Sequence, residues 1–238
     1  MQAVVLAAGD GGRLQPQTAG VPKPLLTLHG RSIISHILDA LSAGGVDAAT
    51  IVVGYRGEQI RRALTTSSPR GMRVGFVENP DYHLGNARSL WAARDAVAGA
   101  PGFVLAMGDH AVEPAMVTAV AAGASTRSRV AVDRADASDP RVGEATLALV
   151  RDDRVVDIGK GLRDWNAIET GLFWCTPAIF DAMTPELRDG EAGAVFAALA
   201  RARRLDAVDV TGRRWIDIDT EDDLRAARAM VGPHGDVA

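Results

Sequence analysis

A glycine-rich segment with two cationic side chains follows the first apolar stretch of the chain. The apolar run AVVLA, residues 3–7, leads into GDGGRLQPQTAGVPKP, residues 9–24. Glycines let backbone N–H groups approach phosphate oxygens without a Cβ in the way, and Arg13 and Lys23 add positive charge. We therefore expect phosphate binding here rather than a simple hinge, and we predict that a phosphate-bearing ligand, such as a nucleotide, contacts Leu6, Ala7, Ala8, Gly9, Gly11 and Gly12.

This segment fits neither of two familiar nucleotide-binding loops. A P-loop would need G-x-x-x-x-G-K-[ST], and a Rossmann fingerprint would need a third glycine where Leu14 stands. The segment is also too long before the next predicted helix for either loop. The phosphate site must therefore be of another kind.

Two further segments place carboxylates where strands end. FVLAMGDH, residues 103–110, runs into Asp109, and WIDIDT, residues 215–220, contains Asp217 and Asp219. Open α/β sheets bind ligands at the carboxyl ends of their strands. Residues two apart share one face of a strand, but the chain turns here into a helix that Thr220 is expected to cap. We expect the two side chains to point to opposite sides, so that only one of them reaches a bound ligand, and Asp219 is a candidate for capping the helix.

Strand-like apolar runs alternate with helical patterns over the first 130 residues. Examples are TIVVG and FVLAM as strands and SIISHILDALSAGG as a helix. This rhythm predicts an α/β fold with a mostly parallel mixed sheet flanked by helices. Residues 133–163 read as short strands with polar turns, so we expect a small inserted β region. The simplest organisation is one domain over residues 1–232 with a flexible tail at 233–238.

The loop motifs together resemble those of the sugar nucleotidyltransferases. The shared pattern is G-x-G-x-R followed by P-K, here Gly9, Gly11, Arg13 and then 22–23, between LAAG and PLLTLHGRSII. The resemblance implies a Rossmann-like, GT-A-like nucleotidyltransferase fold. It also implies that Arg13, Lys23 and Asp109 are catalytic, and that Asp109 and Asp217 hold Mg²⁺ against a triphosphate.

Four segments extend the resemblance to the CTP:inositol-1-phosphate cytidylyltransferases. They are VENPDYHLGNARSLWAARDAV, FVLAMGDH, RVVDIGK and NAIETGLF, and the likeness spans roughly residues 3–230. It implies an enzyme that uses CTP and a small phosphorylated polyol, most simply inositol 1-phosphate. Phosphocholine, a phosphonate or a sugar 1-phosphate stays open as the acceptor, and a non-catalytic nucleotide-sensing domain is the alternative of another class.

Candidate substrate contacts follow from side-chain chemistry and from this resemblance. An amide can serve both the O2 acceptor and the N4 donor of cytosine, and a glycine lets a flat ring approach backbone, so we predict base contacts at Asn79, Gly85 and Asn86. Lys160 is a candidate for the acceptor phosphate, although an exposed lysine is an equal alternative. For the acceptor hydroxyls we predict Glu169 and Thr170, with a simple strand-end turn as the alternative.

Composition excludes several other classes of protein. The net charge of −4 gives no basic excess for nucleic-acid binding. The longest apolar run, AMVTAVAAGA, is far shorter than the ~20 residues that span a bilayer, and the N-terminus lacks the pattern of a signal peptide. We expect a cytoplasmic protein without a membrane partner, while a homo-oligomer stays open. We expect His83 and His110 to be polar residues at the edge of the site rather than zinc ligands.

Overall fold

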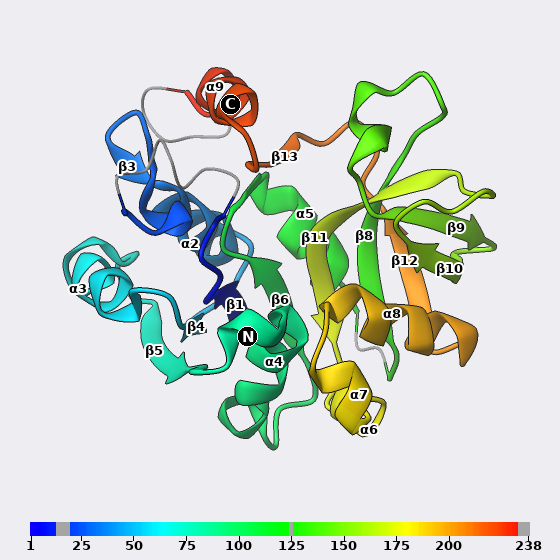
Figure 1. Cartoon of the computed structure of the whole chain (residues 1–238), viewed down its shortest axis with the longest axis horizontal. Helices are drawn as coiled ribbons and strands as arrows, with labels where there is room; N and C mark the ends of the chain where they lie inside the picture. Colours follow the sequence, from blue (N-terminus) through cyan, green and yellow to red (C-terminus); the bar gives the residue numbers. More distant parts are fainter. Residues whose placement is uncertain (13–19, 124–125, 233–238) are drawn as a thin grey trace.

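One nine-stranded sheet runs through the computed structural model (Figure 1), which describes residues 1–12, 20–123 and 126–232. The strand order is β5-β4-β1-β6-β11-β8-β12-β10-β9. In chain order these strands are β1 (Gln2–Ala7), β4 (Ala48–Val53), β5 (Arg73–Glu78), β6 (Phe103–Met107), β8 (Ser128–Arg134), β9 (Leu147–Arg151), β10 (Arg154–Gly159), β11 (Ala167–Cys175) and β12 (Leu205–Asp209).

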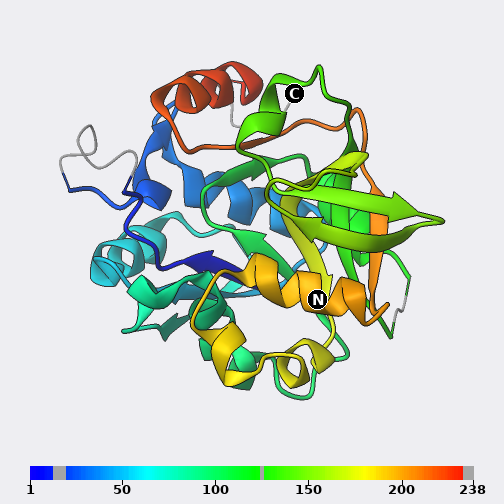
Figure 2. The same ribbon diagram turned by 45° about the vertical axis from the view of Figure 1, so that its right-hand side comes forward.

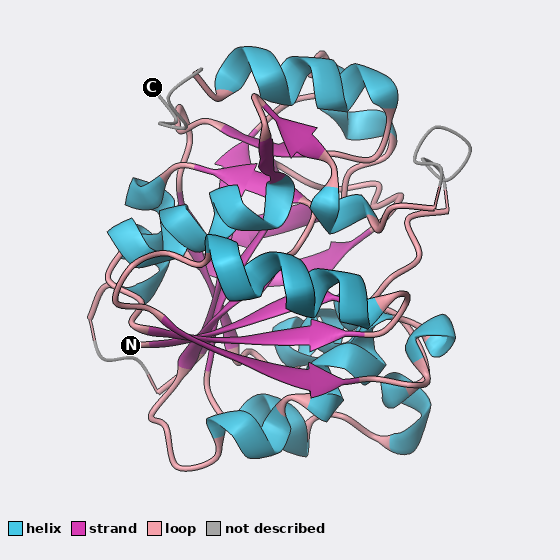
Figure 3. Ribbon diagram, turned by 90° about the vertical axis from the view of Figure 1, so that its left-hand side faces the viewer, coloured by secondary structure: helices cyan, strands magenta, loops and turns pink. Residues whose placement is uncertain are grey.

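Helices cover both faces of this sheet (Figures 1 and 3). One face packs against α2 (Ile33–Ala43), α3 (Gly57–Ser67) and α5 (Pro114–Ala121). The other face packs against α4 (Asn86–Ala92), η3 (Arg94–Val97), α6 (Ala178–Asp181) and α8 (Ala192–Arg201). The short elements η1 (Lys23–Leu25), η2 (Tyr82–Leu84), η4 (Pro140–Gly143) and α7 (Pro185–Arg188) lie in the connections.

The central strand β1 shows why its sequence is apolar throughout. Val4 and Leu6 belong to the core on one face, whereas Ala3, Val5 and Ala7 belong to the core on the other. A strand that is buried on both faces needs apolar residues at every position, because successive side chains point in opposite directions.

The sheet changes character at β11. Strands β5, β4, β1 and β6 are parallel, whereas β11 runs antiparallel to both β6 and β8. The predicted inserted region consists of η4 and the hairpin β9–β10, which joins the same sheet. Asp152 and Asp153 both have positive φ, 48° and 57°, as the tight turns of two-residue hairpins require.

Two small strand pairs complete the fold. β2 (Thr27–Leu28) pairs with β3 (Arg31–Ser32), and β7 (His110–Val112) pairs with β13 (Trp215–Asp217). β13 leads into α9 (Glu221–Met230), which lies at the top of the molecule as drawn in Figures 1 and 2. As predicted, Thr220 caps α9, and it forms a capping box with Asp223.

No helix in the described ranges is long and apolar enough to span a membrane. The predicted tail at 233–238 lies outside the described residues, and the single domain over 1–232 stays a prediction.

Candidate active site

A cleft opens at the carboxyl ends of β1 and β6. Five of the six predicted loop residues line it. The sixth, Ala8, is not part of the lining, and its carbonyl accepts a 2.9 Å hydrogen bond from Tyr55 N–H. The other predicted residues in the lining are Lys23 and Asp109. The full lining is Leu6, Ala7, Gly9, Gly11, Gly12, Lys23, Pro24, Gly108, Asp109 and Asp219. Arg13, the second predicted cation, lies outside the described residues.

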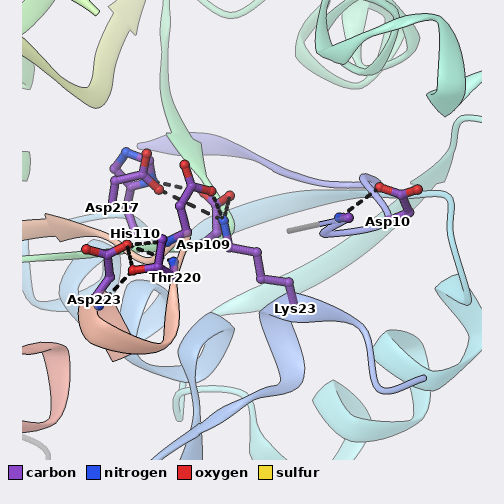
Figure 4. Close-up of polar contacts among 9 residues, drawn as sticks. Asp10, Lys23, Asp109, His110, Asp217, Thr220 and Asp223 are labelled. Carbon is purple, nitrogen blue, oxygen red and sulfur yellow. Dashed lines mark hydrogen bonds and ion pairs between the residues drawn. The ribbon is translucent and has the colours of Figure 1, made fainter. Parts of the chain in front are cut away.

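Lys23 is the cation at the centre of this cleft (Figure 4). Its side chain is 7% exposed, and Nζ donates to Asp109 Oδ2 at 2.8 Å and to Asp219 Oδ1 at 2.6 Å. Asp217 Oδ1 lies 4.0 Å from the same nitrogen. Burial alone lowers the pKa of Lys23, but the surrounding carboxylates outweigh it and raise that pKa. The ammonium therefore keeps its charge in the cleft.

His110 lies on the other side of Asp109 from Lys23 (Figure 4). Its Nδ1 is 2.9 Å from Asp109 Oδ1 and 3.6 Å from Asp217 Oδ1. The pairing of β7 with β13 creates this cluster, because Asp217 is directly opposite His110 in the register. Burial lowers the pKa of His110, but Asp217 and Asp109 outweigh it and raise that pKa to about 9. His110 is thus a buried member of the cluster, where only a residue at its edge was predicted.

The cluster fits a divalent cation. Asp109, His110 and Asp217 each offer one ligand atom, and these atoms lie within 4.8 Å of one another. Asp217 Oδ1 is buried and accepts no hydrogen bond from the described part of the chain. A buried carboxylate oxygen that accepts no hydrogen bond is unfavourable, and a bound cation would satisfy it. Burial raises the pKa of Asp217, which a positive ion at this oxygen would counteract.

The two aspartates of WIDIDT have different surroundings. The strand β13 ends at Asp217, so Asp219 no longer follows the alternation of a strand and reaches Lys23 from the loop before α9. Asp217 belongs to the potential metal cluster, as the sequence favoured. Asp219 is not the cap of α9; its side chain is an ion-pair partner of Lys23, which the sequence did not predict.

Of the predicted acceptor residues, Glu169 lies near the cluster. Its carboxylate accepts a hydrogen bond from Gly171 N–H. Burial raises the pKa of Glu169 to about 7, against the opposing effect of His110. Gly171 has φ +74°, and a Cβ there would lie 2.5 Å from the ring of His110. The start of β11 therefore lies directly against the charged cluster.

The other two predicted acceptor residues differ sharply from each other. Thr170 is fully buried, and its hydroxyl donates to Ala131 O at 3.0 Å. The prediction that this hydroxyl binds the acceptor is therefore corrected: it ties β11 to β8. Lys160 is exposed just after β10, and none of the hydrogen bonds or ion pairs among the described residues involves its side chain. Its role stays a prediction.

The residues predicted to read the base have partners within the protein. Asn79 is buried; its Nδ2 donates to Ser89 Oγ at 3.0 Å, and its Oδ1 accepts from Asp81 N–H at 3.1 Å. A Cβ at Gly85, where φ is +114°, would lie 2.2 Å from the carbonyl oxygen of Gly190. This close approach accounts for the glycine, and its base contact stays a prediction.

Asn86 links two helices at their N-terminal ends. Its Oδ1 accepts from Ala192 N–H at 2.5 Å, and Ala87 N–H donates to Gly190 O at 2.9 Å. These bonds fasten the start of α4 to the start of α8, across about a hundred residues of sequence. The base contact of Asn86 stays a prediction.

A glycine-lined cleft at the ends of parallel strands, with a buried lysine and paired aspartates, is the site of a nucleotidyltransferase. Residues 3–181 match the model of the MobA-like NTP transferase domain, and the chain belongs to that family. The resemblance to nucleotidyltransferases that the motifs indicated is thereby confirmed.

Curated relatives and solved structures agree with this family. The chain is 35% identical, over 96% of its length, to the "Bifunctional IPC transferase and DIPP synthase" of Rubrobacter xylanophilus. That match covers 51% of the relative, and the chain spans about half the length of the first such relatives. It is 30% identical to "UTP--glucose-1-phosphate uridylyltransferase AglF" of Haloferax volcanii, over 94% of this chain and 93% of that protein.

Among solved structures, the chain resembles that of the inositol-1-phosphate CTP transferase from T. maritima, with a TM-score of 0.82 and 26% sequence identity. The match covers 93% of this chain and 90% of that one. The predicted fold class, a GT-A-like nucleotidyltransferase fold, is confirmed.

Proposed function

We propose that the protein transfers a CMP group from CTP to a phosphorylated polyol, inositol 1-phosphate, and releases pyrophosphate. The observation that carries this proposal is the placement of Lys23 and Asp109 together in the glycine-lined cleft, with Asp217 Oδ1 4.0 Å from Lys23 Nζ. The similarity to proteins named as inositol-phosphate cytidylyltransferases supports CTP and inositol 1-phosphate as the substrates.

The reaction needs positive charge more than a general base. A phosphomonoester has a second pKa near ~6, so an acceptor oxygen is already ionised at neutral pH. That oxygen forms a bond to the α-phosphorus of CTP while the bond from the α-phosphorus to the β-phosphate oxygen breaks. The main obstacle is repulsion between the acceptor phosphate and the triphosphate. Lys23 stabilises the developing charge from the cleft, and we assign the same role to Arg13.

Asp109 and Asp217 would hold Mg²⁺, which prefers a few carboxylate oxygens together with substrate phosphates. When bound, Mg²⁺ supplies charge neutralisation for the triphosphate and the leaving pyrophosphate. His110 orients Asp109 from the side away from Lys23. The glycines of the loop present backbone to the phosphates, as their place in the lining indicates.

The acceptor lies, in this proposal, beside the start of β11. Glu169 is near the metal cluster and can accept hydrogen bonds from the hydroxyls of a polyol. Lys160 is exposed just after β10, which pairs with β9, and its ammonium has no hydrogen-bond or ion-pair partner among the described residues, so it can bind a phosphate. Phosphocholine recognition would use an aromatic cage, for which an aromatic content of 5% offers little material.

Pyrophosphate release with Mg²⁺ tests the proposal. Wild-type protein is assayed with CTP, UTP, ATP, GTP and dTTP, each with inositol 1-phosphate, glucose 1-phosphate, phosphocholine and 2-aminoethylphosphonate. We expect release with CTP and inositol 1-phosphate, loss of at least about 100-fold in Asp109→Asn, and wild-type activity in Asp95→Asn, whose carboxylate is exposed on η3.

Each other outcome has a definite meaning. CTP-dependent release with another acceptor supports CMP transfer from CTP and contradicts inositol 1-phosphate as the acceptor. Release that depends on another nucleotide contradicts the assignment of CTP. If no pair of nucleotide and acceptor gives pyrophosphate release but calorimetry shows Mg·CTP binding, the protein is better explained as a non-catalytic nucleotide-sensing domain.

A further inference from the structure

Lys23 has two close carboxylate partners that differ in their relation to the metal cluster. Asp109 Oδ2 is 2.8 Å from Nζ, and Asp219 Oδ1 is 2.6 Å from it. Asp109 belongs to the cluster that fits a cation, together with His110 and Asp217, whereas Asp219 does not. Two carboxylates therefore hold the lysine, and only one of them, Asp109, belongs to the cluster that could hold a metal.

Metal binding and the ion pair with Lys23 compete for the carboxylate of Asp109. When Asp109 coordinates a metal, its carboxylate has less charge to offer Lys23, and the cation repels the ammonium. A flexible lysine with no second partner would then move away from the cleft. Asp219 remains a partner that the metal does not use.

The position of Asp219 is fixed by the start of α9. Asp219 N–H donates to Asp223 Oδ2 at 3.1 Å. The same carboxylate accepts from Thr220 N–H at 2.7 Å, and Figure 4 shows Thr220 beside Asp223. These bonds use the backbone of Asp219 and leave its side chain directed at Lys23. The capping box of α9 thus holds the Asp219 carboxylate at the edge of the cleft.

We propose that Asp219 is a positioning residue for Lys23: it retains the ammonium at the nucleotide phosphates once the metal occupies Asp109. The inference rests on the proposed function, since it assigns Lys23 to the phosphates of the bound nucleotide. It adds a residue to that site and separates the two aspartates of WIDIDT by role. Asp217 is a metal ligand, and Asp219 acts through Lys23.

A double-mutant cycle tests this role. The four proteins are wild type, Asp219→Asn, Lys23→Met and the double variant, and Asp222→Asn on the exposed side of α9 is the matched control. Calorimetry gives the Kd for Mn²⁺ alone and the Kd for CTP with Mg²⁺. We expect Asp219→Asn to weaken CTP binding about 10-fold with Lys23 present and less than about twofold with Met at 23. Asp222→Asn leaves both affinities unchanged.

The Mn²⁺ measurement separates positioning from direct ligation. With Met at 23, a positioning residue changes the Kd for Mn²⁺ by no more than about threefold. A metal ligand would weaken Mn²⁺ binding at least about 10-fold in both backgrounds, and that result overturns the inference. Equal losses of CTP affinity in both backgrounds overturn it as well. If Asp219→Asn unfolds, the cycle is repeated with Asp219→Ala. The bond from Asp219 N–H to the Asp223 carboxylate does not need the side chain of Asp219.

The cycle does not depend on turnover. If the coupling is present but no acceptor supports pyrophosphate release, the inference stands and the proposed reaction fails. If turnover is present and the coupling is absent, the proposed reaction stands and the role of Asp219 is wrong. Wild-type protein that binds neither Mn²⁺ nor CTP refutes both.

Discussion

Glu169 should make the stability of the metal-free protein depend on pH. Burial raises the pKa of this carboxyl from an ordinary 4.5 to about 7, and the charge of Asp217 acts in the same direction. His110 and the Gly171 N–H oppose the effect without cancelling it. Between these two pH values the folded protein binds the Glu169 proton and the unfolded chain does not. The stabilisation is complete below about 4.5 and is lost as the pH rises through about 7.

The size of the effect follows from the change in pKa. A difference of about 2.5 between the folded and unfolded pKa corresponds to roughly 3 kcal/mol, and partial exposure reduces this to about 2–3 kcal/mol. Glu169→Gln keeps the volume and an acceptor for Gly171 N–H but cannot ionise. Relative to wild type, the variant should gain about 2–3 kcal/mol in free energy of unfolding between pH 4.5 and pH 8.5. For a chain of this length the gain corresponds to about 5–10 °C in Tm.

Thermal and urea unfolding in EDTA, at five pH values from 4.5 to 8.5, measure this difference. His110, with its pKa raised to about 9, contributes to both proteins. Glu169 is the smallest of the groups that raise this pKa, after Asp217 and Asp109, so most of the His110 contribution cancels in the comparison. Glu78→Gln, at the exposed end of the edge strand β5, is the control and should show no such trend. If the stability difference between Glu169→Gln and wild type is the same at pH 4.5 and pH 8.5, the Glu169 carboxyl is not desolvated and the reasoning is refuted.

Three further substitutions test other parts of the site. Gly171→Ala puts a Cβ 2.5 Å from the His110 ring at a residue with φ +74°. We expect it to lower the free energy of unfolding by about 2–4 kcal/mol and Mn²⁺ affinity by at least about 10-fold, by urea unfolding and calorimetry. Thr170→Val removes the bond to Ala131 O and should lower the free energy of unfolding by about 1–2 kcal/mol in urea. It should leave the acceptor KM unchanged, and a raised KM would return Thr170 to the acceptor site. Lys160→Ala should raise the acceptor KM about 10-fold in steady-state kinetics without changing the CTP KM; an unchanged acceptor KM would remove Lys160 from the site.

The nucleotide side of the site could be predicted because its signals are local. The glycine loop and Asp109 each follow an apolar strand almost directly, and Lys23 lies at the end of the segment that the glycine loop begins. Parallel strands bring their carboxyl ends to one edge, so residues that follow different strands meet without any knowledge of tertiary contacts. The motif spacing was sufficient to place these residues in one cleft.

The partners of these residues could not be predicted in the same way. His110 and Asp217 meet because β7 pairs with β13, across more than a hundred residues. Because β13 ends at Asp217, the side chain of Asp219 can turn toward Lys23. If the strand continued, its alternating pattern would fix the direction of the Asp219 side chain. Neither the register nor the end of a three-residue strand is encoded in a local pattern.

Contacts between distant loops also involve two of the residues that the sequence assigned to the base. Gly85 and Asn86 looked like a site for a flat ring because one lacks a side chain and the other carries an amide. In the fold, the carbonyl of Gly190 needs the space beside Gly85, and Ala192 N–H needs the amide oxygen of Asn86. A glycine followed by an asparagine serves a backbone contact as well as it serves a ligand, and sequence alone does not distinguish the two.

The antiparallel direction of β11 gives the site its second half. Leu172 pairs with Ala106 near the end of β6, so the start of β11 lies at the edge where β1 and β6 end. A parallel strand in this position would present its carboxyl end there and place Glu169 at the opposite edge of the sheet. Because β11 is reversed, Glu169 and Gly171 come from its first half and still reach His110. The parallel strands thus supply the glycine-lined cleft and the reversed strand supplies the neighbouring carboxyl, so the two substrates of the proposed reaction would meet at the cluster of Asp109, His110 and Asp217 between them.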